Sequence, residues 1–214
     1  MTLWHPSSDK LIEFSSGVGS AAMNIAVSAH LHFCKDCLRQ VVEYESVAAV
    51  LFEQQAEVTM AKDGFETLME RIVRQPVSRP STTRVVPSRF PPVVEKLMAH
   101  GTDALCWKKP MKNLRVSQLL TDEQGLTLGL HHMKAGCRVP QHTHRGHEIS
   151  LVIEGGFSDQ MGSYGVGDFI TLSTEHHHSP QADADGDCWL LSVVEAPVRL
   201  TGPLGWILNP FIKA

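Results

Sequence analysis

The chain has 214 residues, 43% of them hydrophobic and 20% charged, a composition typical of a globular protein with one large or two small domains. Its formal net charge of −4 argues against nucleic-acid binding as the main function, and its apolar runs are too short to span a bilayer. The opening residues lack a basic segment followed by an apolar core, so we expect no secretory signal, no membrane association and a cytoplasmic location.

Charge is unevenly distributed along the chain. Residues 1–60 carry three basic and seven acidic side chains, a net charge of −4. Residues 61–115 carry eleven basic and five acidic side chains, and residues 116–214 carry five basic and eleven acidic ones, giving +6 and −6. An acidic N-terminal segment suits a basic, DNA-binding protein partner, because charge complementarity steers association.

The first 74 residues have a helical pattern. Apolar residues in 11–14 and 21–29 predict two short helices, and the stretch 37–55 predicts a longer one. A further short helix is predicted over 66–73, beginning near Asp63 and Gly64. The long helix carries an apolar stripe at helical spacing, formed by Leu38, Val41, Val42, Val47, Val50 and Leu51.

A metal-ligand pattern, H-x3-C-x2-C, lies within this helical segment and consists of His30, Cys34 and Cys37. In a cytosolic chain a C-x2-C pair indicates a metal or redox site, and no strand precedes Cys34 as it would in a thioredoxin-like redox pair. A histidine one helical turn before the first thiolate lies on the same face, so three donors converge. Structural zinc takes four donors. His5 is the favoured fourth donor, with His32 as the alternative, although His32 points to a different side of the helix from His30.

A proline-rich segment over 75–92 separates two kinds of sequence. It contains five prolines and little periodicity, which predicts a stiff, partly extended linker that few packed elements cross. Beyond it, short β segments punctuated by glycine fit a small jelly-roll barrel. We therefore predict an α+β protein of two domains, a helical bundle over 1–74 and a barrel over 93–214. The clearest predicted strands are 126–132, 148–153, 168–172 and 188–194.

The barrel segment contains a second metal-ligand pattern. Residues 136–155 match G-x5-HxH-x3-E-x6-G, with His142, His144 and Glu148 as the ligand-type side chains. The two-residue period of a strand would place all three on one face. Imidazole and carboxylate donors suit a divalent metal such as zinc, iron, manganese or nickel. The pattern resembles the first motif of cupins.

A fourth donor is expected from the histidines at 176–178. Cupins commonly place their last ligand at a fixed distance after a Gly-Asp pair, and His178 follows Gly167 by eleven residues. Strand alternation puts His176 on the same face as His178, so His176 is the alternative ligand. The same alternation predicts that His147 and His177 point away from the metal.

The five cysteines do not form an even disulfide framework. Cys34 and Cys37 pair by spacing. Cys106, Cys137 and Cys188 stand alone in the sequence, and we expect them to be buried as small hydrophobic side chains.

The two metal-ligand patterns, in this order, resemble ChrR-type anti-sigma factors, in which an N-terminal zinc-binding anti-sigma domain precedes a C-terminal cupin. The resemblance covers nearly the whole chain and includes residues 5–12, 29–37, 103–107, 136–155, 196–197 and 201–203. Family members often have Cys-x-Cys where this chain has Cys188-Trp189-Leu190, which argues against dithiol chemistry at this point. The resemblance implies that zinc is bound by His5, His30, Cys34 and Cys37, and that the cupin metal is bound by His142, His144, Glu148 and His178.

The resemblance also implies a function. An anti-sigma factor of this type sequesters an extracytoplasmic-function sigma factor and releases it under oxidative stress, such as singlet oxygen or an organic peroxide, sensed by the cupin. It is not an enzyme, does not bind nucleic acid directly, and holds zinc in its helical domain and zinc or another divalent transition metal in its cupin. The alternative hypothesis is a dioxygenase-like cupin metalloenzyme, because a three-His, one-Glu site leaves coordination positions open. Such an enzyme would have no need of the helical zinc site.

Overall fold

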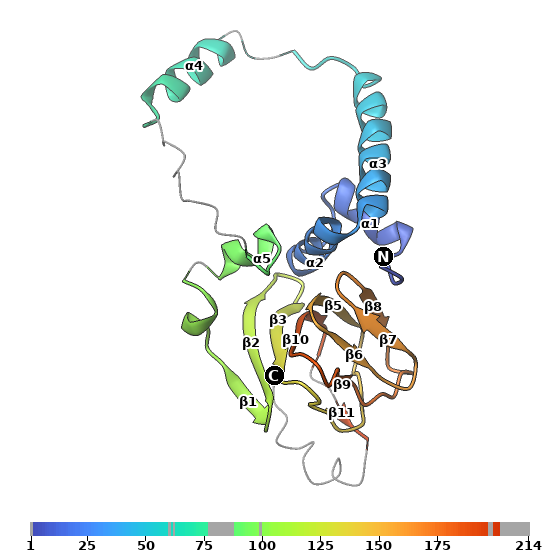
Figure 1. Ribbon diagram of the computed structural model, residues 1–214. Helices are drawn as coiled ribbons and strands as arrows, with labels where there is room; N and C mark the ends of the chain where they lie inside the picture. The colour runs from blue at the N-terminus through green and yellow to red at the C-terminus, as the bar shows by residue number, and fades with distance from the viewer. Residues whose placement is uncertain are drawn as a thin grey trace.

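The computed structural model describes residues 2–59, 61, 63–76, 88–98, 100–196 and 199–201 (Figure 1). The middle of the predicted linker and the end of the cupin beyond residue 201 lie outside the described residues. The helices of the described chain come first and are α1 Ser8–Ser15, α2 Ala21–Phe33, α3 Lys35–Glu53, α4 Gly64–Arg74 and α5 Pro92–Leu97, with a 3-10 helix at Thr102–Ala104.

The first three helices begin at side-chain caps. Ser7, Ser20 and Cys34 each accept a hydrogen bond from the backbone N–H three residues later. Such an acceptor satisfies one of the free N–H groups of the first turn. The backbone of Cys34, at φ −111° and ψ 103°, separates α2 from α3. The sequence had predicted that His30 and Cys34 lie on one helix. Instead, Cys34 ends α2, and the H-x3-C-x2-C pattern lies at a corner between two helices.

Within the described residues, the β half forms three antiparallel sheets. The largest has the strand order β1-β2-β3-β10-β5-β8, a second has the order β7-β6-β9, and the third pairs β11 with β4. Strands β3, β5, β8 and β10 confirm the four predicted segments to within one residue at each end. The strands are β1 Lys108–Met111, β2 Leu114–Thr121, β3 Thr127–Met133, β4 His142–Thr143, β5 Glu148–Glu154, β6 Gly156–Ser158, β7 Ser163–Gly165, β8 Phe169–Leu172, β9 Gln181–Ala182, β10 Cys188–Val194 and β11 Arg199–Leu200.

Alternation along the central strands separates two apolar clusters. In β10, Trp189 and Leu191 belong to the cluster that the helices cover, whereas Cys188 and Leu190 belong to the cluster inside the barrel. The pattern follows from the two-residue period of a strand. One face of the large sheet is therefore free to receive helices, while the other encloses the interior.

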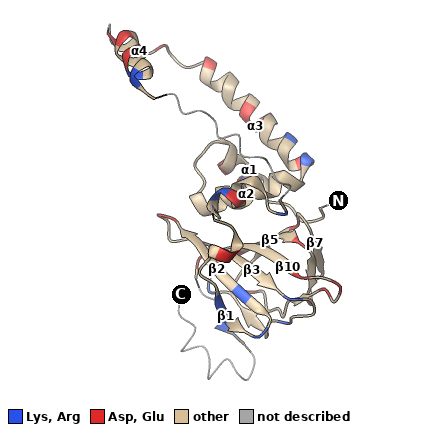
Figure 2. Cartoon of the chain, turned by 60° about the vertical axis from the view of Figure 1, so that its left-hand side comes forward, with Lys and Arg blue, Asp and Glu red and all other residues tan. Residues whose placement is uncertain are grey.

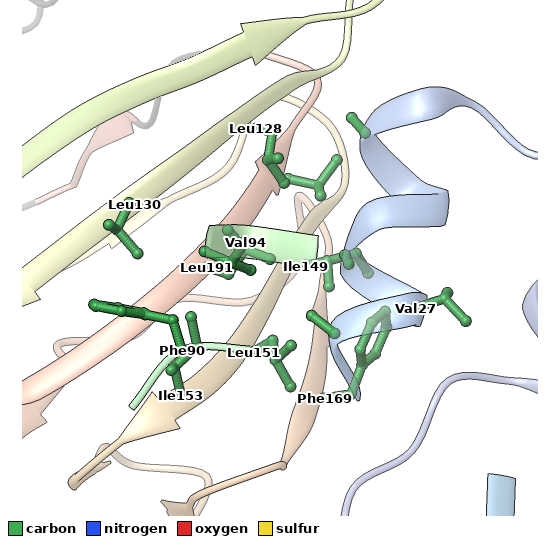
Figure 3. Packing of buried hydrophobic residues seen from close by; sticks show 14 of the residues in the cluster. Val27, Phe90, Val94, Leu128, Leu130, Ile149, Leu151, Ile153, Phe169 and Leu191 are labelled. Carbon is green, nitrogen blue, oxygen red and sulfur yellow. The ribbon is translucent and has the colours of Figure 1, made fainter. Parts of the chain in front are cut away.

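Helices α2 and α5 pack on this outer face, so both halves of the chain share one apolar core (Figure 3). Val27 of α2 and Val94 of α5 are fully buried in the same cluster as Leu128 and Leu191 of the sheet. Burying one such side chain contributes about 1.5–3 kcal/mol. The expectation that few packed elements join the two halves is wrong, because α2 buries its apolar face on the sheet as well as against its neighbouring helices.

Helix α4 differs from the other helices. None of its residues is buried, and it stands away from the body of the molecule in Figure 1. Among the described residues, no helix is both long enough and apolar enough to cross a bilayer.

Candidate metal centres

The four donors predicted in the N-terminal half meet at one point. The ligand atoms of His5, His30, Cys34 and Cys37 all lie within 4.8 Å of one another. Nδ1 of His5 is 3.4 Å from Sγ of Cys34 and 3.4 Å from Sγ of Cys37. Bonds of about 2.0–2.3 Å to a tetrahedral zinc ion would separate the donors by about 3.5 Å. The residues present therefore fit a His2Cys2 zinc site.

The fold explains which histidine completes this group. The extended segment before α1 carries His5, the last turn of α2 carries His30, the corner before α3 carries Cys34, and the first turn of α3 carries Cys37. His32, the alternative donor, is exposed and contacts the ring of Phe33 instead. The described structure thus groups His5, and not His32, with the other three donors.

The burial and hydrogen bonding of His30 suit a metal ligand. It is fully buried, and its Nδ1 lies 2.8 Å from the carbonyl oxygen of Gly167. A carbonyl can only accept, so Nδ1 carries the proton and Nε2 carries the lone pair. Among the described residues, that Nε2 is buried without a hydrogen-bond partner. A buried acceptor without a partner destabilises the fold unless a metal ion binds it. Burial also lowers the pKa of His30 to about 4, so the ring is neutral near pH 7.

The two thiols differ in acidity. Burial and the neighbouring Cys34 raise the pKa of Cys37 to about 12. Burial also acts to raise the pKa of Cys34, but hydrogen bonds from the Cys37 N–H and from Thr2 outweigh it and leave this pKa below its usual value. Without a metal the pair thus retains a proton, and binding a divalent cation would release it.

A second group of donors lies in the barrel. His142, His144 and His178 are buried, and their ligand atoms form a cluster. Nε2 of His178 is 3.0 Å from Nε2 of His142 and 3.2 Å from Nε2 of His144. Burial lowers the pKa of His142 to about 4, and burial also lowers that of His178. Neutral imidazoles are the form that binds metals.

Each of these three histidines has an oxygen acceptor at its other ring nitrogen. Nδ1 of His142 is 2.9 Å from the carbonyl oxygen of Pro140, Nδ1 of His144 is 2.8 Å from Oε2 of Glu148, and Nδ1 of His178 is 2.8 Å from Oδ2 of Asp159. These contacts place the protons on Nδ1 and direct three Nε2 lone pairs to one point. Metal-bound histidines in proteins have this arrangement, and the lone pairs would repel one another without a cation.

Glu148 is placed differently from the other predicted ligands. Its Oε2 contacts Nδ1 of His144 and its Oε1 accepts from Ser150, so it lies outside the three-histidine group. Burial acts to raise its pKa, but the contact with His144 outweighs burial and keeps the pKa below its usual value. The expectation that one strand carries the whole motif is wrong, because β4 ends at Thr143 and β5 begins at Glu148. Ligation by Glu148 stays a prediction.

The remaining histidines of the two motifs lie outside the metal group. His147 is exposed and bonds to Glu195, and His177 is exposed. His176, the alternative ligand, instead accepts from the backbone N–H of Ser173 through Nδ1. Among the described residues, the three-histidine group therefore includes His178 and excludes His147, His176 and His177.

Two residues of the barrel site were missed from the sequence. Asp159 lies in the turn between β6 and β7, and no ligand-type spacing links it to His178. His131 lies 2.8 Å from Oγ of Ser192, and burial lowers its pKa. Alternation in β3 puts His131 on the interior face with Met133, a signal that the sequence carries but that has no metal-ligand pattern.

Replacing Asp159 with alanine should weaken metal binding in the barrel about 10- to 100-fold, because the carboxylate orients His178. Metal affinity would be measured by competition with a chelator. Asp187→Ala is a matched control, since Asp187 forms the same kind of carboxylate–imidazole pair with His132, away from the three-histidine group. Unchanged affinity in Asp159→Ala would contradict the assignment of Asp159.

The other cysteines only partly follow the prediction. Cys137 and Cys188 are buried, as expected, but Cys106 is exposed. Cys106 precedes β1 in a stretch where half-buried and exposed residues alternate, so no core is available to it. Burial raises the pKa of Cys188 to about 12, which makes its thiol unreactive near neutral pH.

Comparisons with known proteins agree with this architecture. Residues 95–197 match the family model described as the ChrR cupin-like domain. Over 214 residues the chain is 28% identical to the anti-sigma-E factor ChrR of Cereibacter sphaeroides, covering 100% of both chains. Its fold is similar to that in the crystal structure of Rhodobacter sphaeroides SigE in complex with the anti-sigma ChrR. That match has a TM-score of 0.76 and 24% identity, and covers 91% of this chain and 99% of the other. Residues 95–197 thus match a ChrR cupin-like domain, and over its full length the chain is similar to the anti-sigma-E factor ChrR.

Proposed function

We propose that this protein is an anti-sigma factor that binds and sequesters an extracytoplasmic-function sigma factor. The observation that carries the proposal is the unpacked apolar surface of α3 and α4. The full-length relative is itself named an anti-sigma factor, and the similar fold occurs in a complex of ChrR with SigE. These matches support the proposal because they extend over the helical half as well as the cupin.

The apolar surface of α4 is a single stripe. Its exposed members recur at the spacing of one helix face, and large exposed apolar patches mark interaction sites. On α3, Phe52 is 80% exposed, and a groove of about 400 Å³ between α2, α3 and α5 continues the surface. The exposed apolar residues are Phe65, Leu68, Met69, Ile72 and Val73 on α4, and Leu38, Val42, Val47, Val50, Leu51 and Phe52 on α3.

Charge supports a basic partner. Figure 2 shows acidic residues along α3, whose basic residues lie near its start, and both acidic and basic residues on α4. A sigma factor binds DNA and presents basic surfaces, so the acidic residues would favour its approach. The apolar stripe would then supply the buried part of the interface.

The two metal centres would have separate tasks. Zinc bound by His5, His30, Cys34 and Cys37 would stabilise the short helices that present the apolar surface, because structural zinc contributes directly to folding. The cupin, with zinc or another divalent metal at its histidines, would sense oxidative stress and cause release of the sigma factor. The buried Cys188 is poorly suited to react with an oxidant, whereas the metal centre and the 41%-exposed Met161 could be oxidised.

Placing a charge on the apolar face of α4 tests the proposal. Ile72→Glu should weaken sigma-factor binding at least about 30-fold, the loss expected for a buried interface residue. Folding should be unaffected because α4 has no buried residue. Thr67→Glu adds the same charge on the polar face and should bind normally. Binding would be measured by calorimetry with the purified sigma factor, and wild-type affinity of Ile72→Glu would contradict the proposed interface.

One observation favours the alternative of a cupin metalloenzyme. His131 and Ser192 lie inside the barrel close to Glu148, and neither belongs to the three-histidine group that would bind the metal. Turnover of a substrate by the metal-loaded protein, with no binding to any sigma factor, would establish that alternative.

A further inference from the structure

A turn of the cupin holds the extended segment that precedes α1. Oδ1 of Asp168 accepts from the N–H of Leu3 at 2.7 Å and from the N–H of Trp4 at 3.2 Å. The N–H of Phe169 donates to the carbonyl oxygen of Trp4 at 2.9 Å. Asp168 is 5% exposed, and its Oδ2 accepts from Gly165 at 2.8 Å, which fixes the carboxylate. The residues directly before His5 are therefore bonded to the cupin.

The same turn holds a second ligand of the N-terminal centre. The carbonyl oxygen of Gly167 accepts from Nδ1 of His30 at 2.8 Å. Gly167 has φ +91°, and a Cβ there would lie 2.8 Å from Cβ of Phe33 and 2.5 Å from Thr2. A side chain at this position would thus strain the backbone and push the two halves of the chain apart. The turn 165–169 approaches the helices closely enough to orient both His5 and His30.

We propose that the turn 165–169 is the outer shell of the N-terminal metal centre, so that the cupin determines how tightly this centre holds its metal. Asp168 is a positioning residue for His5, and the carbonyl of Gly167 is one for His30. Of the other two donors, Cys34 lies at the corner between α2 and α3 and Cys37 lies in the first turn of α3. The inference rests on the N-terminal metal site proposed above, and not on the identity of the protein partner.

The hairpin of β6 and β7 leads from this turn to the other metal centre. Asp159, at the tip of the hairpin, bonds to His178, and its Oδ1 lies 3.4 Å from the hydroxyl of Tyr164. The ring of Tyr164 lies 5.6 Å, between centroids, from the ring of Trp4, the residue before His5. A change at His178 can therefore reach the N-terminal ligands through one short hairpin whose Tyr164 is buried.

Cobalt provides a probe for the N-terminal centre in the full-length protein. Thiolate-to-cobalt charge-transfer absorption reports only a site with cysteine ligands, so it distinguishes this centre from the three-histidine one. The rate at which excess chelator removes the absorption would be measured. Asp168→Ala should accelerate removal about 10- to 100-fold, the usual effect of losing an outer-shell partner, and Asp168→Asn should fall between it and wild type.

A second variant acts from the other side of the contact, in case Asp168→Ala disturbs the cupin itself. Leu3→Pro removes the N–H that donates to Asp168, and the Leu3 side chain that it replaces is 76% exposed. It should accelerate cobalt loss in the same way. Leu3→Ala keeps that N–H and should behave as wild type.

Asp122→Ala is the control for general loosening of the two halves. Asp122 accepts from the N–H of Ala22 in α2 and from that of Leu126 in its own β2–β3 turn, away from the segment that carries His5. It should leave the rate near that of wild type. Equal rates in wild type, Asp168→Ala and Leu3→Pro would overturn the inference, as would equal acceleration by Asp122→Ala. Absence of the absorption in wild type would instead refute the N-terminal metal site itself.

Transmission from the second centre is tested by combining variants. His142→Ala, which removes a ligand of the barrel site, should accelerate cobalt loss several-fold in an otherwise unchanged chain. It should add nothing in the Asp168→Ala chain, because the connecting turn is already released. The same acceleration in both chains, or none in either, would contradict transmission through the turn.

Discussion

Replacing Cys34 and Cys37 together with serine should release the N-terminal metal, loosen α1 to α3 and abolish sigma-factor binding. Both thiolate donors are lost, and structural zinc contributes an apparent binding free energy of about 10–16 kcal/mol in small zinc domains. Helices α1 and α3 have few buried residues, with only Leu11 buried in α1 and Cys37 and Val41 in α3. Zinc content, thermal unfolding and sigma-factor binding would be measured on the same preparation.

Cys106→Ser is the matched control, because Cys106 is exposed and lies outside the group of donors. It should keep zinc, stability and binding. His5→Ala should bind zinc more weakly but detectably, since three donors remain. Full zinc retention in the Cys34→Ser, Cys37→Ser chain would refute the assignment of the N-terminal site.

Replacing His142 with alanine should remove the metal from the cupin while leaving sigma-factor binding intact. One of three converging Nε2 donors is lost, and the remaining pair is a poor site for a divalent cation. The interface proposed on α3 and α4 lies on other elements, so binding should persist. Release of the sigma factor in response to oxidant should be strongly reduced, as measured by transcription from a dependent promoter.

His147→Ala serves as the control for His142→Ala. His147 belongs to the same motif but is exposed and bonded to Glu195. It should retain both the cupin metal and the response to oxidant. Loss of sigma-factor binding in His142→Ala, or a normal oxidant response without cupin metal, would contradict the proposed division between binding and sensing.

The sequence predicted which donor-type side chains lie together better than it predicted the backbone elements that carry them. The H-x3-C-x2-C spacing identified three donors, although Cys34 ends one helix and caps the next instead of continuing α2. Convergence does not require a continuous helix, because a tight corner brings the same residues together. His5 could be favoured over His32 only weakly, since its position depends on hydrogen bonds to Asp168, more than 160 residues away.

The barrel site shows a similar limit. The motif spacing located His142, His144 and His178, but a turn between β4 and β5 places Glu148 against His144. Asp159 has no recognisable spacing, because its contact with His178 depends on how the β6–β7 hairpin folds over the barrel. Long-range contacts of this kind are fixed by tertiary structure, which periodicity does not report.

Domain organisation was predicted in outline only. The change from a helical to a β pattern was visible in the sequence, but the packing of α2 on the sheet was not. An apolar helix face has the same sequence period whether it packs against other helices or against a sheet. Val27 and Val94 could equally have closed a separate helical core. The boundaries at 74 and 93 mark a change in sequence pattern, and the two parts that they separate pack in a common apolar core.

Mixing the purified, zinc-loaded chain with the extracytoplasmic-function sigma factors of its own host tests the central claim most directly. Complex formation would be followed by size-exclusion chromatography, and inhibition by transcription with core RNA polymerase. The account predicts a stable complex with at least one of these sigma factors and loss of transcription from its promoter. Failure to bind any of them, with transcription unchanged at saturating protein, would contradict it.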